Sequence, residues 1–314
     1  MTINSAVEKC QVAEQMHPYL IVKASEFDEL RNRSLHEPWA RFKSTAISVA
    51  VSLTFNTESN YMARCVNIRE LVDTCSLAYI VDPDNKTTYI NKIVDVLNYW
   101  NSGTEGNIFD ELNNTDWTYS VPPSSAFFSC VLALDTIYPE LSFEQLDAAE
   151  SLLQNVADWF WSHNMSWQTA NWGSRGIWAL YKNDTTRIVQ AKEGYFNALM
   201  SYISDDGVGI IGTGYSNMRF SCDRHSKQYF MDVLTYTGQY DYYNDSKVKG
   251  FYEWLYGYAS TAFKRIWIYG DTSFNNAIYR GSSIYKAGNL SPDIAKYAAW
   301  LLEGYNITYG RLLI

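Results

Sequence analysis

The sequence has few of the residues that build metal and redox sites. Its 314 residues include only 4 His and 5 Cys. The cysteines show no metal-ligand spacing, and zinc and calcium motifs are missing, so no metal or other cofactor is expected. Their odd number leaves at least one thiol free, and we expect most to be buried thiols. They are Cys10, Cys65, Cys75, Cys130 and Cys222.

Long apolar runs are also missing. No stretch approaches the ~18 apolar residues of a spanning helix, and no apolar run of signal-peptide type opens the chain. We therefore expect no membrane partner. Glycosylation sequons are frequent, as in a secreted glycoprotein whose signal peptide has been removed, which is our expectation for localisation. The sequons begin at Asn32, Asn85, Asn113, Asn164, Asn183, Asn244, Asn289 and Asn306.

Positive charge is scarce overall, since the net charge is −9. This excess of acid argues against a nucleic-acid partner. It also opposes binding of an acidic polysaccharide, but local fields matter more than the sum. Arg219, Arg224 and Lys227 stand against Asp223 alone, which gives a local positive strip.

Aromatic residues are abundant, at 16% of the chain with 25 Tyr and 11 Trp. Such rings fill the cores of large helical proteins, and they also stack on sugars. Trp117 and Tyr119 lie in a long polar segment, residues 101–123, of the kind that forms binding loops. An ordinary surface crossover is the alternative for that segment.

Strand-type alternation is nearly absent, and apolar residues recur at the helical period. The pattern predicts an all-α fold of roughly ten helices in successive pairs packed around an axis. Residues 1–16 read as a lead-in and residues 17–314 as one domain. Predicted caps are Ser25, Ser124 or Ser125, and Gly238. Predicted helices include 59–80, 88–100, 142–163, 170–181, 185–203, 221–237 and 246–263.

The candidate site lies between Trp167 and Tyr236. It combines Asn171, Trp172 and Arg175 with a glycine-rich loop that contains Tyr215. His225 and Tyr229 follow, four residues apart, so they share one face of a helix. Alternatives remain open for two parts of this stretch. Asn171 can be a helix cap, and residues 205–207 have the composition of a turn.

These residue types suit β-elimination in a uronic acid polymer. The site must neutralise the sugar carboxylate, take the C5 proton and protonate the leaving O4. Asn and Arg suit the first task, and Tyr or His the other two, when a positive field lowers their pKa. The catalytic candidates are Asn171, Arg219, Arg224, His225 and Tyr229. The substrate-binding candidates are Trp117, Tyr119, His163, Trp172, Arg175, Tyr215, Lys227 and Arg280.

The sequence resembles the alginate lyase and heparinase II/III-like group of polysaccharide lyases. Three stretches carry this: the opening from His17-Pro18-Tyr19-Leu20 through Pro38-Trp39, the run Asn171-Trp172-Gly173-Ser174, and Asp206-Gly207 followed by Arg, His and Tyr. The resemblance implies an (α/α) toroid, an incomplete barrel of about five to six helical hairpins. It makes Asn171 the carboxylate neutraliser and Tyr229 the catalytic tyrosine. Histidine follows Asn in the alginate lyase type, whereas Trp172 stands here, so His225 or His163 would supply the imidazole.

The expected function is therefore that of a carbon–oxygen lyase acting on polysaccharides, a monomer that cleaves mannuronate-rich alginate or glucuronan. One alternative is an (α/α) barrel glycoside hydrolase with paired carboxylates, for which Asp205, Asp206 and Asp223 are available. The other is a non-catalytic toroid that binds carbohydrate.

Overall fold

A computed structural model describes most of the chain, and what it describes is helical. The described residues are 17–37, 39–55, 61–101, 112, 121–165, 167–210, 227–255 and 292–296. Within these ranges there is no strand, only an isolated antiparallel bridge between Ile203 and Gly209. The prediction of an all-α fold is confirmed.

The observed helices follow the predicted order, with shifts of a few residues at most of the ends that the structure describes. The helix predicted from residue 221 is described from Lys227 onward, since residues 221–226 lie outside the described ranges. The main helices are α1 (Phe27–Arg33), α2 (Trp39–Ser52), α3 (Tyr61–Val81), α4 (Lys86–Asn101), α6 (Val121–Ile137), α7 (Phe143–Ser162), α8 (Gln168–Tyr181), α9 (Thr185–Met200), α11 (Lys227–Tyr236) and α12 (Ser246–Glu253).

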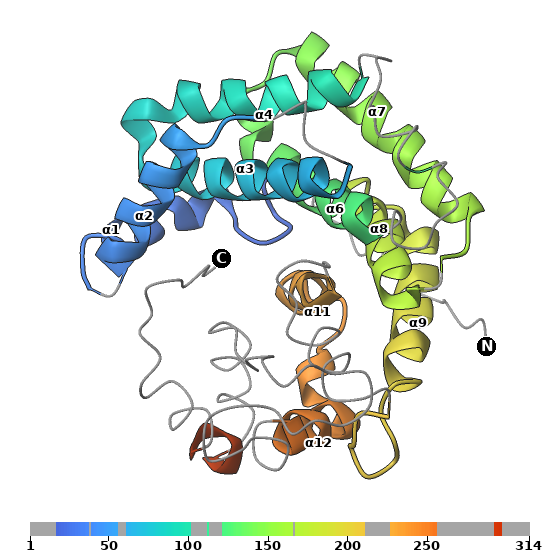
Figure 1. Cartoon of the computed structure of the whole chain (residues 1–314). Helices are drawn as coiled ribbons and strands as arrows, with labels where there is room; N and C mark the ends of the chain where they lie inside the picture. The colour runs from blue at the N-terminus through green and yellow to red at the C-terminus, as the bar shows by residue number, and fades with distance from the viewer. Residues whose placement is uncertain are drawn as a thin grey trace, which may run out of the picture.

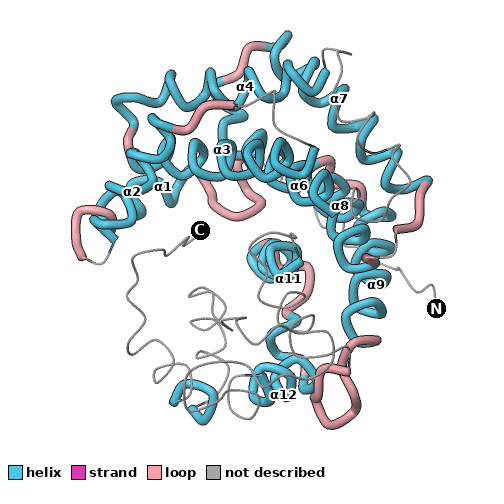
Figure 2. The backbone as a smooth tube through the Cα atoms, viewed as in Figure 1, coloured by secondary structure: helices cyan, strands magenta, loops and turns pink. Residues whose placement is uncertain are grey.

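The larger helices form two rows (Figures 1 and 2). In the inner row, α3 contacts α6, α6 contacts α8, and α8 contacts α11. In the outer row, α4 contacts α7, and each outer helix packs against the inner helix that precedes it in the chain: α4 on α3, α7 on α6 and α9 on α8. Figure 1 shows the helices from α1 to α9 along a curve, with α11 on its concave side.

Helix α6 is the centre of the core, and all of its residues are buried. A helix that is apolar on every side belongs inside a protein, where neighbours cover each face. Its start differs from the prediction: it begins at Val121, so Ser124 and Ser125 are not caps but buried positions inside it. Pro122 and Pro123 fit because the first turn of a helix needs no backbone N–H.

The inner helices run parallel. At one end, the Ser124 hydroxyl of α6 lies 2.9 Å from the Ser174 hydroxyl in the first half of α8. At the other end, Tyr79 near the end of α3 and Lys86 at the start of α4 both contact Glu140, which follows α6. Glu140 therefore joins the C-terminal ends of α3 and α6. The N-terminal ends of the inner row therefore lie together, and so do its C-terminal ends.

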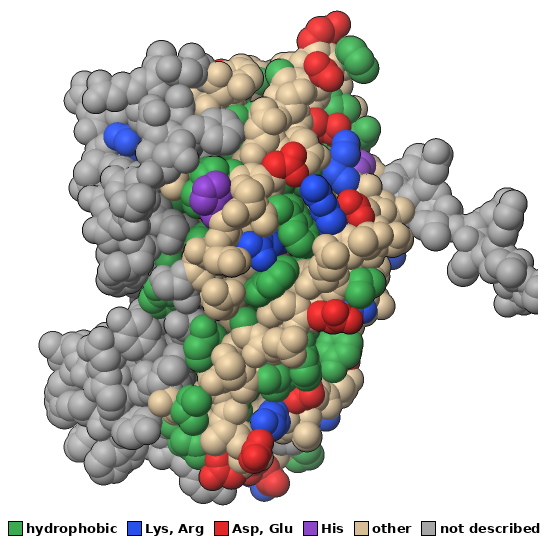
Figure 3. All heavy atoms as spheres, turned by 90° about the vertical axis from the view of Figure 1, so that its right-hand side faces the viewer, with side chains coloured by type: hydrophobic (Ala, Val, Ile, Leu, Met, Phe, Trp, Pro, Cys, Tyr) green, Lys and Arg blue, Asp and Glu red, His purple; other side chains and the backbone are tan. Residues whose placement is uncertain are grey.

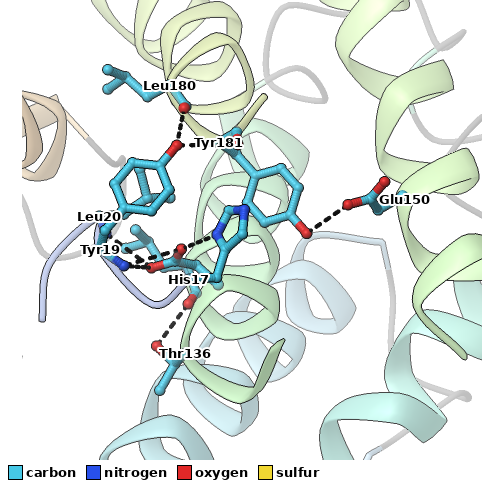
Figure 4. Close-up of polar contacts among 9 residues, drawn as sticks. His17, Tyr19, Leu20, Thr136, Glu150, Leu180 and Tyr181 are labelled. Atoms are coloured by element: carbon cyan, nitrogen blue, oxygen red, sulfur yellow. Dashed lines mark hydrogen bonds and ion pairs between the residues drawn. The ribbon is translucent and has the colours of Figure 1, made fainter. Parts of the chain in front are cut away.

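An N-terminal strap, residues 17–31, crosses the C-terminal ends of all four inner helices. Asp135 of α6 accepts hydrogen bonds from His17 Nδ1 at 2.6 Å and from the Leu20 amide at 2.9 Å (Figure 4). The Tyr19 hydroxyl donates to the carbonyls of Leu180 and Tyr181 at the end of α8. These contacts tie the strap to α6 and α8.

The rest of the strap reaches the other two inner helices. Tyr236, the last residue of α11, donates its hydroxyl to Glu26. Arg31 Nε donates to the Ile80 carbonyl of α3 at 2.8 Å. Since these partners lie far apart in sequence, the strap joins segments that no local interaction would hold together.

Of the two other predicted caps, Gly238 is present and Ser25 is not. Gly238 follows α11 with φ +70° and ends the helix as predicted, because its amide donates to the Thr235 carbonyl. Ser25 is not a cap: a short 3₁₀ turn, Ala24–Glu26, precedes α1, and the Glu26 carboxylate accepts the Lys23 amide at 2.7 Å.

The prediction of buried cysteines holds as far as the structure describes them, since Cys65, Cys75 and Cys130 are buried. In the described ranges, none of the helices combines the length and apolar character needed to cross a membrane.

Candidate functional site

The first half of α8 carries three of the predicted site residues: Asn171, Trp172 and Arg175. Helix α8 is buried almost throughout because α6, α7, α9 and α11 all contact it or its flanks. Gly176 allows the closest of these approaches. A Cβ atom there would lie 2.0 Å from Cζ of Phe230 in α11. The α8 backbone therefore sits directly against the helix that bears Tyr229.

Arg175 joins α8 to the C-terminal end of α7. Its Nε donates to the Phe160 carbonyl at 2.7 Å, and one Nη donates to the His163 carbonyl at 2.8 Å. The same Nη lies 3.2 Å from Oδ1 of Asn164. These carbonyls end α7, where the helix dipole carries partial negative charge, so a cation is favoured there.

Two indole rings enclose the same guanidinium. Its carbon lies 4.3 Å from the ring centre of Trp172 and 5.4 Å from that of Trp161. Arg187 of α9 also lies over Trp161, at 5.4 Å. Cation–π attraction of this kind strengthens as the charge loses water. We call Trp161, Asn171, Trp172, Arg175 and Arg187 the indole–arginine corner.

The two arginines of this corner differ in charge balance. Arg187 is paired with Asp158 at 3.1 Å and with Asp184 at 3.8 Å. Among the described residues no carboxylate pairs with Arg175, and its second Nη makes no hydrogen bond. Burial lowers the pKa of Arg175, yet a guanidinium stays charged. The corner therefore holds one buried positive charge that no described acid neutralises.

Asn171 lies inside α8, so it is not the cap of that helix. Its amide Nδ2 donates to the His163 carbonyl at 3.1 Å, beside the bond from Arg175. The residue has no exposed surface, and its Oδ1 has no hydrogen-bond partner in the described part of the chain. In this structure Asn171 thus holds the end of α7 and presents no exposed donor.

His163 ends α7, as the sequence predicts. Its ring stacks on Trp159, with centres 4.3 Å apart and planes at 10°. Nδ1 lies 2.9 Å from both the Trp159 carbonyl and the Ser162 hydroxyl, while the side chain remains exposed. The imidazole is therefore fixed at the surface beside the indole–arginine corner.

Tyr229 lies in the first turn of α11. Two contacts orient this helix: Phe230 packs on Gly176 of α8, and Tyr236 at the other end contacts Glu26 of the strap. Helix α11 thus runs parallel to α8, and its N-terminal end points toward the end of the inner row that holds the indole–arginine corner. The side chains of Tyr229 and Lys227 lie outside what the structure describes.

The remaining predicted residues lie outside the described ranges. The carbohydrate-stacking, basic and imidazole candidates in this group are Trp117, Tyr119, Tyr215, Arg219, Arg224, His225 and Arg280, and Asp223 joins them among the hydrolase candidates. The structure therefore brings Asn171, Trp172, Arg175 and His163 together and places none of the others against them.

The predicted turn at 205–207 is present. Gly207 has φ +87°. The Ser204 amide donates to the Val208 carbonyl, and the Val208 amide donates to the Ser204 hydroxyl. Asp205 is fully exposed and paired with Lys247 at 2.7 Å. Asp206 accepts a hydrogen bond from the Ser204 hydroxyl, which lowers the pKa of its carboxyl.

Sequence reasoning missed Trp161, Asn164 and Arg187, which complete the surroundings of Arg175. A partial signal was present: Trp161 ends the same aromatic run as Trp159 and His163. The residues of α9 give no such signal, because Arg187 reaches the corner only through the packing of helices.

On the side of the molecule that carries α7 and α9, acidic and basic side chains alternate with apolar ones (Figure 3). No surface of one sign dominates this view. Within the described residues, no three His, Cys, Asp or Glu side chains are grouped to hold a metal ion.

A comparison with models of known protein families finds no match to this chain, and a comparison with curated proteins finds none either.

Proposed function

We propose that this protein is a polysaccharide lyase that cleaves a uronic acid polymer by β-elimination, on an incomplete (α/α) toroid. The two rows of paired helices support the toroid, since α3, α6 and α8 are each followed by an outer helix that packs on them. The observation that carries the function is the charge of Arg175, which no described carboxylate neutralises, at the end of the inner row toward which the N-terminal end of the described part of α11 points.

A fixed buried cation favours this chemistry for two reasons. It attracts a polymer whose sugars carry carboxylates, although the protein as a whole is acidic. It also stabilises negative charge that develops on the sugar when the C5 proton leaves. The cation cannot be lost by titration, because an arginine side chain does not deprotonate in proteins.

The proposal assigns a role to each of these residues. Tyr229 transfers the proton, with His225 or His163 in support. Arg219 and Arg224 contact the sugar carboxylate. Arg175 contributes its electrostatic field without contacting the sugar. Asn171 has no exposed donor here, so we assign it the task of fixing the His163 carbonyl beside Arg175. The preferred polymer is mannuronate-rich alginate or glucuronan.

The test follows formation of the C4–C5 double bond by its near-ultraviolet absorbance. Polymannuronate, polyguluronate, glucuronan and hyaluronan are supplied separately to the wild type, Tyr229→Phe and Tyr240→Phe. Removing the Tyr229 hydroxyl should cut the rate at least about a hundredfold, the usual worth of a general acid or base. Tyr240 is a partly exposed tyrosine beyond the other end of α11 and serves as the control.

An absorbance increase that survives in Tyr229→Phe would keep the lyase and reject the site. Absence of any increase on all four polymers would reject the lyase.

A glycoside hydrolase is the second candidate, and one observation favours it. Asp206 and Glu253 line the same surface hollow, so two carboxylates converge there. Hydrolysis would release reducing ends without new absorbance, and Glu253→Gln would abolish it.

A further inference from the structure

A surface hollow between the turn after α9 and helix α12 has no part in the proposed elimination. It has a volume of about 390 Å³ and is lined by Asp206, Val208, Gly250, Glu253 and Trp254. This volume falls within the range of small-molecule sites, roughly 300–1,000 Å³.

The lining follows from the spacing of residues in α12. Gly250, Glu253 and Trp254 stand at positions i, i+3 and i+4, so they share one face of the helix. That face meets the turn at Gly207, where an added Cβ would lie 2.7 Å from the Gly250 carbonyl carbon. The close approach of the two glycine backbones brings the turn that carries Asp206 against the helix that carries Glu253.

The charge of the hollow is negative. Lys247 of α12 contacts the turn, but its ammonium group is paired with Asp205. The pKa of Asp206 is lowered by the Ser204 hydroxyl, so this carboxylate is ionised at neutral pH. Glu253 has no hydrogen bond or ion pair among the described residues. Among the described residues, two carboxylates and no cation line the space.

An indole completes the site. Trp254 is partly exposed, and its ring packs on Phe251 at 5.6 Å, which fixes it on the helix. An indole attracts both the C–H face of a pyranose and an ammonium group. Carboxylates accept hydrogen bonds from hydroxyl and ammonium groups, and they repel a uronate.

We propose that this hollow binds a protonated amino sugar, with the ammonium group between Asp206 and Glu253 and the ring against Trp254. The ligand is thus opposite in charge to the polymer of the proposed elimination. The inference stands without that proposal, because it uses none of the residues of the indole–arginine corner or of α11.

The hollow also lies at the functional end of the helical rows. Helix α9 runs antiparallel to α8, since Trp172 near the start of α8 packs on Gly194 in the second half of α9. The turn after α9 therefore emerges at the end where α8 begins. An amino sugar bound there would occupy the same end of the molecule as the proposed substrate.

The test is calorimetric titration of the full chain at neutral pH with glucosamine, glucose and glucuronate as separate ligands. We expect glucosamine to bind at least about tenfold more tightly than glucose, and glucuronate not to bind, because a hydrogen bond to a charged group is worth about 1.5–3 kcal/mol. Glu253→Gln should weaken glucosamine binding at least about tenfold and leave glucose unchanged. Asp147→Asn, an exposed acid on α7, should change neither.

Equal binding of glucose and glucosamine would overturn the inference, as would unchanged binding in Glu253→Gln. Calcium is titrated in a fourth experiment. Calcium binding that needs Glu253, without glucosamine binding, would make the hollow a cation site and refute the amino sugar. Circular dichroism of each variant confirms that it is folded, so a loss of binding reports on the hollow. Lyase activity is measured on the same samples, and its loss or retention leaves this result unaffected.

Discussion

Removal of the Asp135 carboxylate of α6 should destabilise the protein by releasing the strap. Asp135 has no exposed surface. It accepts from His17 Nδ1 at 2.6 Å, from the Leu20 amide at 2.9 Å and from the Tyr19 amide at 3.1 Å. In Asp135→Ala these three donors lose their acceptor, while the strap remains closed over the ends of α6 and α8.

The magnitude follows from those contacts. Each buried donor left without a partner costs about 1–3 kcal/mol, and breaking a buried charged pair from one side costs about 3–5 kcal/mol. His17 is slightly exposed, so water can partly replace its hydrogen bond, and the total cost stays at about 3–5 kcal/mol. We expect Asp135→Ala to lower the free energy of unfolding by about 3–5 kcal/mol.

Asp135→Asn removes the charge of the side chain and keeps its shape. Its remaining oxygen can accept one or two of the amides, so about 1–3 kcal/mol should be lost. Urea unfolding, followed by circular dichroism, measures both changes, with Asp147→Ala as an exposed control expected within about 0.5 kcal/mol of wild type. A loss below about 1 kcal/mol in Asp135→Ala would refute the reasoning, because it would mean that the strap is not held through this carboxylate.

Three further predictions test the packing, the titration and the corner. Gly176→Ala should cost about 1–3 kcal/mol or more, measured by urea unfolding, because the new methyl group would overlap the ring of Phe230. Burial, with help from the Glu140 charge, raises the pKa of Tyr79 to about 12. The fold favours the protonated phenol, so its contribution is complete below the unfolded pKa of about 10 and is lost as the pH rises toward 12. Unfolding midpoints between these values should fall less steeply in Tyr79→Phe. Arg175→Lys should lose about 1–3 kcal/mol in the same unfolding assay, since an ammonium group cannot reach the three acceptors of the guanidinium.

Local patterns were enough to predict most helices and several of their ends. Helix α7 begins after Ser142, whose hydroxyl accepts the Gln145 amide, and it ends at His163 as the spacing of apolar residues requires. The start of α6 was missed because a pair of prolines resembles the end of a loop. Prolines are also accepted in the first turn of a helix, and only the surrounding core decides between the two.

The site residues were harder to predict, because their roles depend on contacts between distant segments. The sequence indicates that Asn171 and Arg175 are polar groups at a helix start, but not that the end of α7 supplies their acceptors. A carbonyl does not vary with residue type, so the pattern of side chains cannot reveal it. The same holds for His17, because its partner Asp135 is 118 positions away and gives no signal at that distance.

The two ends of the inner row have different kinds of contact, and this asymmetry supports the placement of function. At the C-terminal ends, the strap satisfies carbonyls of α3 and α8, the Asp135 carboxylate of α6 and the Tyr236 hydroxyl of α11. Groups bound in this way have little capacity left for a ligand. At the N-terminal ends lie a charged guanidinium without a described acid partner and a hollow with two carboxylates and no described cation. A buried charge without a partner, such as that of Arg175, costs free energy in a folded protein, and charges of this kind often mark functional sites. This contrast is the reason why we propose that binding and chemistry occur at the N-terminal ends of the inner row, while the described contacts of the strap at the opposite end stabilise the fold.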